Sequence, residues 1–377
     1  MARYRLDSIC QIISGSTPKT GVQAYWNGDK KWITPAELSE SDYIIYDTER
    51  KLTEAGVKSA GLTLLPKGTV ILSSRAPIGK VAIAGCEMYC NQGFKNLVCS
   101  DIISNKYLYW YLRSKTDFLN SLGRGATFKE ISKSTVAEIE LNVPELSAQC
   151  KRVAHLEKLQ SILSLRRAQL AKLDKLAKCR FVEMFGYIEL NYRLEDLCSL
   201  ITDGTHQPPQ FTDSGIPFLL VSNIKENYIN YETYKFIDEQ TYRHLIKRTP
   251  VETGDLLLST VGSYGHPAIV QGTQRFCFQR HIAFLKPIRE RVNSVYLHQA
   301  ILSDNVQEQI EKSVLGVAQK TLNLSAIRRL VIPYPPIEKQ NSFASFVQRI
   351  DKLRVAVQAS LDKTQQLFDS LMQEYFG

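Results

Sequence analysis

The sequence predicts an α+β protein made of two tandem, pseudo-symmetric repeats, each a strand-rich globular domain followed by one long helix. Three observations predict this class. The second half of the chain repeats the first at an offset of about 190 residues. Each half closes with a long apolar-periodic segment that has no interior glycine or proline. The remaining sequence is rich in Gly, Thr and Tyr, with short apolar runs typical of strands.

Composition and charge limit the function. The 377 residues are 44% hydrophobic and 23% charged, which is typical of a folded globular protein. A net charge of +9 favours a polyanionic partner such as nucleic acid, the alternative being a basic protein without an anionic ligand. Met1–Cys10 lacks a signal core and no stretch reaches the ~20 apolar residues of a membrane span, so we expect a cytoplasmic protein.

The repeat is anchored at several separate places. Tyr4–Asp7 returns as Tyr192–Glu195, and the spacing of Leu6, Ile9, Cys10 and Ile13 predicts one face of a short opening helix. A glycine turn precedes a buried strand in both halves, at Gly68–Ser73 and Gly254–Ser259. The repeats divide into four segments, 1–144 and 187–335 as globular domains and 145–186 and 336–377 as helices.

Each helix is expected to begin after a proline, at Pro144 and Pro335-Pro336. Apolar residues then follow at steps of three and four, which predicts a heptad seam interrupted by Arg166, Arg354 and Thr364. The two seams are expected to pair as an antiparallel coiled coil that holds the domains apart; the alternative is that each helix lies on its own domain. The seam residues are Leu156, Leu159, Leu163, Leu170, Leu173, Val347, Ile350, Val357, Leu361, Phe368 and Leu371.

Three stretches carry a resemblance to a known family: Leu64–Val70 with its counterpart Thr253–Leu257, Gly215–Leu219 followed by Ser222–Ile224, and Ile332–Gln340. With the order domain, helix, domain, helix, the whole chain resembles the specificity subunit of type I restriction-modification systems. The resemblance implies two target recognition domains, each reading one half of a split DNA sequence, and helices that set their spacing and bind two methyltransferase subunits. It also implies restriction subunits that join the complex, with S-adenosylmethionine and ATP on the partners and no cofactor or small-molecule substrate on this chain.

DNA contacts are predicted in polar loops, where basic side chains meet phosphates and short polar or forked side chains read bases. An ordinary surface or turn role is the alternative for each residue. In the first domain they are Ser16, Thr17, Lys19, Lys30, Lys31, Arg75, Lys80, Arg124, Thr127 and Lys129; in the second, Thr205, His206, Gln207, Lys225, Tyr264, His266, Arg275, Arg280, Gln319 and Lys320.

A catalytic site is not expected. Tyr334-Pro335-Pro336 lacks the Asn or Asp of an adenine methyltransferase motif, and the chain has no Walker loop and no HExxH motif. Cys86, Cys90 and Cys99 lack zinc-ligand spacing, so no metal is expected. Two other functions stay open: a two-domain scaffold that binds proteins through its helices, and an enzyme of unrecognised type.

Overall fold

The computed structural model describes residues 2–39, 42–75, 77–125, 129–225, 227–314, 316 and 320–377. Two compact units divide the chain: Met1–Leu165 with Leu361–Gly377, and Arg166–Ser360. These units cross the boundaries drawn from the sequence, because each globular domain packs against part of both long helices. Among the described residues no helix is long and apolar enough to cross a membrane.

The first unit is organised around a five-stranded sheet in the order β2-β9-β6-β7-β4, beside a three-stranded sheet, β5-β3-β8, and the pair β1-β10. Its strands are β1 (Ala2–Arg5), β2 (Cys10–Ser14), β3 (Trp26–Ile33), β4 (Ile44–Ile45), β5 (Arg50–Leu52), β6 (Val70–Leu72), β7 (Val81–Ala84), β8 (Tyr89–Cys90), β9 (Lys95–Cys99) and β10 (Glu140–Val143). Its short helices are α1 (Leu6–Ile9), α2 (Glu54–Ser59), α3 (Asn105–Ser114), α4 (Thr116–Leu122) and α5 (Lys133–Ala137).

The second unit repeats this plan with a four-stranded sheet, β12-β20-β17-β18, a three-stranded sheet, β16-β13-β19, and the pairs β14-β15 and β11-β21. Its strands are β11 (Leu190–Arg193), β12 (Cys198–Asp203), β13 (Ile216–Leu219), β14 (Ile224–Lys225), β15 (Tyr228–Ile229), β16 (Phe236–Ile237), β17 (Leu256–Ser259), β18 (Pro267–Ile269), β19 (Cys277–Phe278), β20 (Ile282–Pro287) and β21 (Val331–Pro333). Its short helices are α7 (Glu239–Leu245), α8 (Ser294–Ile301), α9 (Asp304–Ser313) and α10 (Leu324–Arg329).

The central strands follow the predicted glycine turns. Gly68 and Gly254 both have positive φ values, 92° and 93°, which a side chain would strain. The buried strands β6 and β17 follow, and each pairs with its neighbours in antiparallel register. The predicted glycine-turn-strand element is therefore confirmed in both halves.

The opening helix is shorter than predicted. Only Leu6–Ile9 is helical, and Cys10–Ser14 continues as β2, paired with β9. In the second unit the equivalent is a 3₁₀ turn, Leu194–Asp196, followed by β12. A spacing of three to four residues over so short a stretch fits a turn plus a strand as well as a helix, and the β-branched Ile12 and Ile13 favour the strand.

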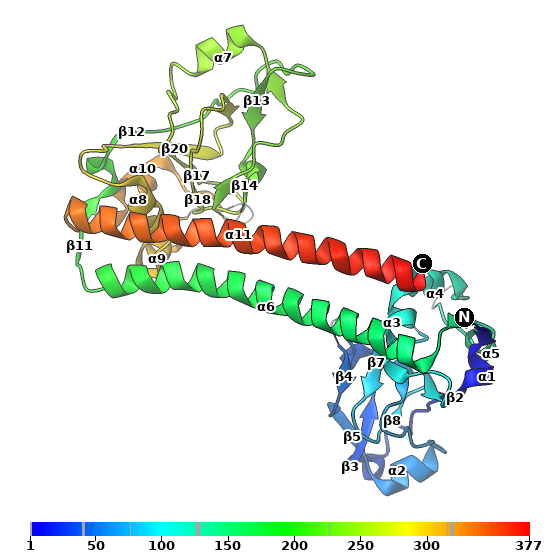
Figure 1. Cartoon of the computed structure of the whole chain (residues 1–377). Coiled ribbons are helices and arrows are strands. Elements are labelled where there is room, and N and C mark those ends of the chain that lie inside the picture. The colour runs from blue at the N-terminus through cyan, green and yellow to red at the C-terminus, as the bar shows by residue number, and fades with distance from the viewer. Residues whose placement is uncertain are drawn as a thin grey trace. The chain divides into compact units, whose positions relative to one another are not determined.

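The long helices are α6 (Leu146–Phe185) and α11 (Ile337–Phe376), which run side by side in opposite directions (Figure 1). In the second unit Phe181 of α6 packs on Phe343 near the start of α11, with ring centroids 5.5 Å apart. In the first unit the Arg152 guanidinium lies over the Tyr375 ring near the end of α11, 4.9 Å from its centroid. The predicted antiparallel coiled coil is therefore confirmed.

None of the eleven predicted seam side chains is exposed. Leu156, Leu163, Val347, Ile350 and Val357 are buried. The half-buried positions are Leu159, Leu170, Leu173, Leu361, Phe368 and Leu371.

The end of each long helix is buried in a globular core. Phe376 packs on Tyr107 of α3 with ring centroids 5.2 Å apart, and Phe185 packs on Tyr296 of α8 at 5.0 Å. Gln149 and Gln340, both fully buried, fix each helix start through hydrogen bonds of 2.8 Å, from Ser104 N to Gln149 Oε1 and from Gln340 Nε2 to Pro335 O. Each domain is therefore joined to the start of one long helix and to the end of the other.

Candidate nucleic-acid interface

At one end of the main sheet in the first unit, two polar loops lie against each other, Ser14–Lys19 and Asn91–Gly93. We call them the first paired loops. The Ser16 N–H donates to the Cys90 carbonyl at 3.1 Å. A Cβ on Gly15 would lie 2.1 Å from the Cys90 oxygen, so only glycine permits this approach. The loops therefore form one surface with a defined backbone.

The second unit has the same feature in Thr202–Gln207 and Gln279–His281, the second paired loops. The Thr205 N–H donates to the Phe278 carbonyl at 3.0 Å, and a Cβ on Gly204 would lie 2.1 Å from that oxygen. Gly15 and Gly204 are thus structural equivalents, as are Ser16 and Thr205. Polar side chains on a rigid backbone are what base recognition requires.

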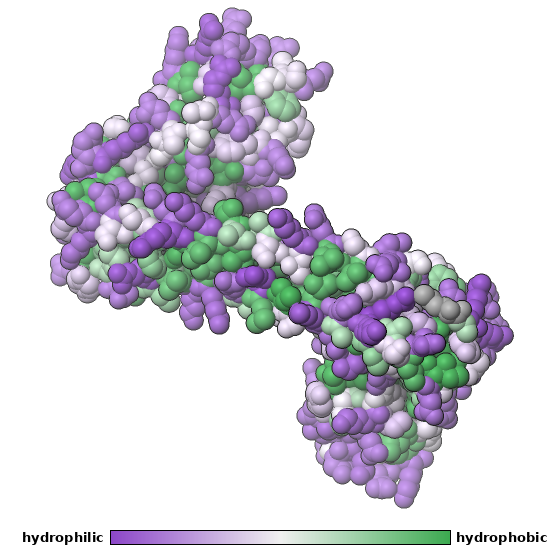
Figure 2. Space-filling model, in the orientation of Figure 1, coloured by the Kyte–Doolittle hydropathy of each residue, from purple (hydrophilic) through white to green (hydrophobic). Residues whose placement is uncertain are grey.

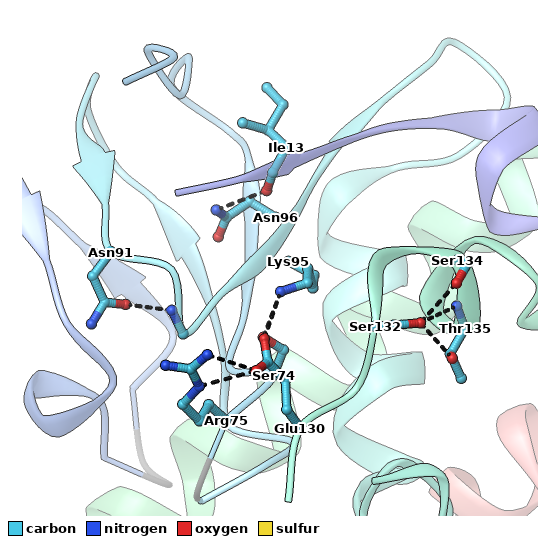
Figure 3. A network of polar contacts seen from close by, with 11 residues as sticks. Ile13, Ser74, Arg75, Asn91, Lys95, Asn96, Glu130, Ser132, Ser134 and Thr135 are labelled. Carbon is cyan, nitrogen blue, oxygen red and sulfur yellow. Dashed lines mark hydrogen bonds and ion pairs between the residues drawn. The ribbon is translucent and has the colours of Figure 1, made fainter. Parts of the chain in front are cut away.

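Beneath the first paired loops lies an ionic cluster, shown in Figure 3 with Glu130 between Arg75 and Lys95. Arg75 Nη2 lies 2.7 Å from Glu130 Oε2, and Lys95 Nζ lies 3.2 Å from Glu130 Oε1. Lys95 Nζ also donates to Ser74 Oγ at 3.3 Å, and its side chain is only 8% exposed. Burial alone would raise the pKa of Glu130, but the hydrogen bonds from Arg75 and Lys95 outweigh it and lower that pKa. The cluster pairs the buried Lys95 with a carboxylate and ties the loop at Glu130 to the sheet.

A backbone contact that we call the Arg124–Glu130 bridge adjoins this cluster. Arg124 and Glu130 exchange backbone hydrogen bonds of 3.0 and 2.9 Å, and the Ile131 N–H donates to the Ser74 carbonyl at 2.9 Å. The corresponding bond in the second unit runs from Leu322 N–H to the Thr260 carbonyl at 2.8 Å. There Lys320 lies 2.6 Å from Glu311 and also contacts the Tyr264 hydroxyl at 3.3 Å. The hydrogen bond to Glu311 raises the pKa of Lys320 and keeps it cationic.

Several predicted DNA-contacting residues of the first domain lie on these loops. Ser16, Thr17 and Lys19 belong to the first paired loops. Arg124 and Lys129 are exposed at and beside the Arg124–Glu130 bridge. Arg75 is bound to Glu130.

Three other predicted lysines make contacts elsewhere in the unit. Lys30 pairs with Asp29 at 3.1 Å, Lys31 donates to the Tyr46 carbonyl at 2.6 Å, and Lys80 donates to the Leu38 carbonyl. Thr127 lies outside the described residues.

The second domain divides in the same way. Thr205, His206, Gln207 and Arg280 lie on the second paired loops, with His206 Nε2 3.0 Å from Asp203 Oδ2. The other predicted residues of this domain that the structure describes are Lys225, Tyr264, His266, Arg275 and Lys320.

Of these, Lys225 is exposed on β14, His266 Nδ1 lies 3.2 Å from Asn227 Oδ1, and Arg275 lies 3.0 Å from Glu239. Gln319 lies outside the described residues.

The sequence interpretation overlooked Gln92 and the Lys95–Glu130 pair. Gln92 is exposed, and its side-chain oxygen accepts a hydrogen bond from the Thr17 hydroxyl across the first paired loops. The internal repeat could have identified Gln92, since Cys90–Gly93 aligns with Phe278–His281 in the second half of the sequence. Lys95 has Ala283 as its counterpart, so repetition gives no sign of it.

The long helices offer a different kind of surface. In the second unit Leu176, Val182, Leu353 and Val355 are 47–70% exposed on α6 and α11, and apolar side chains are visible along the helices in Figure 2. Exposed apolar side chains on a paired helix are typical of a protein-binding surface. Within the described residues no group of three or more His, Cys, Asp or Glu side chains could hold a metal ion.

Comparison with known proteins places this architecture in a family. The family model of the type I restriction modification DNA specificity domain matches residues 1–175 and again 190–364. The MjaIX type I restriction enzyme specificity subunit of Methanocaldococcus jannaschii is 28% identical over 395 aligned residues, covering 98% of this chain and 90% of the relative. The EcoBI specificity subunit of Escherichia coli is 23% identical over 316 residues, covering 74% of this chain and 66% of the relative.

Two solved structures share the fold over the whole chain. The crystal structure of a type I restriction-modification S subunit from M. genitalium has a TM-score of 0.61 at 14% identity, and 96% of it is covered. A chain from a structure describing complex assembly and conformational transition of the type I system has a TM-score of 0.63 at 17% identity, and 97% of it is covered.

Proposed function

The chain belongs to the type I restriction-modification DNA specificity family, and from this premise we propose that it selects the DNA target for partner enzymes and catalyses no reaction itself. Each globular domain reads one half of a split, asymmetric sequence. The observation that carries this proposal is the equivalence of the first and second paired loops, one set per domain, built around Gly15 and Gly204. The two sets of loops present different side chains, so two different half-sites are expected.

The partners follow from the same premise. Two methyltransferase subunits bind the coiled coil and supply S-adenosylmethionine chemistry, and restriction subunits with ATP join them to make a nuclease. The exposed apolar side chains of α6 and α11, such as Leu353 and Val355, support a protein-binding role for the helices. The net charge of +9 supports binding to duplex DNA.

The proposal is tested by mapping adenine methylation across the host genome by single-molecule sequencing, with and without this gene. Loss of one split, asymmetric motif on deletion, and its return on complementation, is the expected result. If every methylated motif survives while the partner methyltransferase is expressed, the chain is a scaffold and not a specificity subunit.

A further inference from the structure

The first and second paired loops can be superposed residue by residue, because equivalent backbone hydrogen bonds fix both ends. At one end the Cys90 carbonyl accepts from the Ser16 N–H at 3.1 Å, and the Phe278 carbonyl accepts from the Thr205 N–H at 3.0 Å. At the other end the Gly93 carbonyl accepts from the Ser74 N–H at 2.8 Å, and the His281 carbonyl accepts from the Thr260 N–H at 3.0 Å. Two residues separate the fixed points in each domain, so the loops are equal in length. Gln92 and Arg280 therefore occupy one structural position.

This position is exposed in both domains, on a backbone that cannot shift without losing those bonds. In the first domain the Thr17 hydroxyl donates to Gln92 Oε1, which orients the amide and leaves its Nε2 hydrogens and a second Oε1 lone pair. In the second domain Arg280 Nε lies 3.4 Å from Nε2 of its neighbour His281, while His206, the counterpart of Thr17, pairs with Asp203. The same backbone thus presents a planar amide in one domain and a planar guanidinium in the other.

The two side chains differ in the base that they fit. A glutamine amide donates to N7 and accepts from N6–H₂ of adenine, whereas an arginine fork donates twice to O6 and N7 of guanine. We infer that Gln92 and Arg280 are equivalent specificity-determining residues, Gln92 selecting an adenine in the first half-site and Arg280 a guanine in the second. This inference rests on the proposed function. It changes the role of Arg280, which as a basic loop side chain was predicted to meet phosphate.

The test uses the full chain assembled with its methyltransferase subunits and a DNA duplex library randomised across both half-sites. Wild-type protein is expected to select a split motif with an adenine in one half and a guanine in the other. Gln92→Ala should relax one adenine position, lowering its discrimination about 10- to 100-fold, and Arg280→Ala should do the same at one guanine position. Gln92→Arg should move the preference at its position from adenine towards guanine, leaving the other half-site unchanged.

Lys19→Ala is the matched control, because Lys19, like Gln92, is exposed on the first paired loops and is expected to touch phosphate. It should weaken binding to all sequences alike and lower the salt slope by about one. If Gln92→Ala and Arg280→Ala, with intact folding, behave like Lys19→Ala or change nothing, the inference is overturned while the proposed function stands. If wild-type protein selects no motif, both fall.

Discussion

Below their paired loops the two domains differ at equivalent backbone positions. The first places Lys95, Glu130 and Arg75 there, linked as ion pairs. In the second domain Ala283 occupies the sheet position of Lys95. Thr321 and Val261 pair through their backbones, as Glu130 and Arg75 do in the first domain. Three backbone hydrogen bonds around them are equivalent in the two domains, donated by Ser16, Ser74 and Ile131 in the first and by Thr205, Thr260 and Leu322 in the second. Backbone contacts and glycines therefore hold the paired loops in place, and the side chains beside them can be ionic or uncharged.

Features shared by both domains should therefore be costly to remove in both. Gln149→Leu leaves the Ser104 N–H and the Ile102 and Pro144 carbonyls without their partner, and Gln340→Leu does the same around Asn293 and Pro335. We expect each change to lower the free energy of unfolding of its own unit by about 3 kcal/mol, since each stranded buried group costs roughly 1–3. Hydrogen exchange of β6 and β17 measures the two units separately.

An equal loss of protection in both units from either single variant would contradict this locality. Gln160→Leu, on a half-buried position of the same helix α6, is the control for the substitution itself and should leave exchange in β6 within about 0.5 kcal/mol of wild type.

Features found in one domain only should matter only there. Glu130→Gln removes the counter-charge of the buried Lys95, and we expect the first unit to lose about 2 kcal/mol, below the 3–5 of a fully buried pair because Glu130 is partly exposed. Thr321→Ala, its counterpart in the second unit, should cost under about 0.5 kcal/mol. All three tryptophans, Trp26, Trp32 and Trp110, lie in the first unit, so tryptophan fluorescence during urea unfolding reports that unit alone.

The same cluster predicts a pH dependence. The pKa of Glu130 is lowered in the folded protein, so its contribution is complete above the unfolded value of about 4.3 and is lost as pH falls through the folded pKa. The difference in urea midpoint between wild type and Glu130→Gln should therefore be largest near neutral pH and shrink below about pH 4. A difference that is constant from pH 7 to pH 3 would show that the charge of Glu130 is irrelevant.

The second unit should respond in the opposite direction at Asp255, the counterpart of Thr69. Burial raises the pKa of Asp255, against weaker lowering by the Glu252 N–H and Lys286. Its carboxylate thus disfavours folding at neutral pH, and acidification through the raised pKa removes that penalty. Relative to Asp255→Asn, wild-type protein should gain protection in β17 as pH falls. A relative loss instead would reverse the assigned direction.

The smallest effect is expected at the polar interruption of the coiled coil. Arg354 of α11 contacts Asp174 and the Tyr228 hydroxyl, whereas its counterpart on α6 is the buried Leu163. Because the Asp174 side chain is 61% exposed, the ion pair contributes about 0–1 kcal/mol, and Arg354→Leu should change stability by less than about 1 kcal/mol. Asp174→Ala, which removes one carboxylate partner of the arginine and leaves Tyr228 and Asp351, is the contrasting variant and should be the more harmful by hydrogen exchange of α11.

Much of this architecture could be predicted because it depends on local patterns. The repeat and the glycine turns at Gly68 and Gly254 are encoded within short stretches. The heptad spacing from Leu156 and from Val347 likewise specifies helices that must bury one face. The end of the opening helix at Ile9 could not be predicted, since Leu6–Ile13 fits two periodicities and pairing of Cys10–Ser14 with β9 decides between them.

What the sequence by itself determined is therefore the order of domains and helices, the antiparallel pairing and the family resemblance, because periodicity and repetition are properties of the chain. Only the tertiary structure decided which loops meet. Gln92 and Thr17 are 75 residues apart and join only because the glycine at position 15 lets two loops touch. Glu130 likewise reaches Lys95 across 35 residues. Contacts between distant segments depend on packing, which no short stretch of sequence encodes.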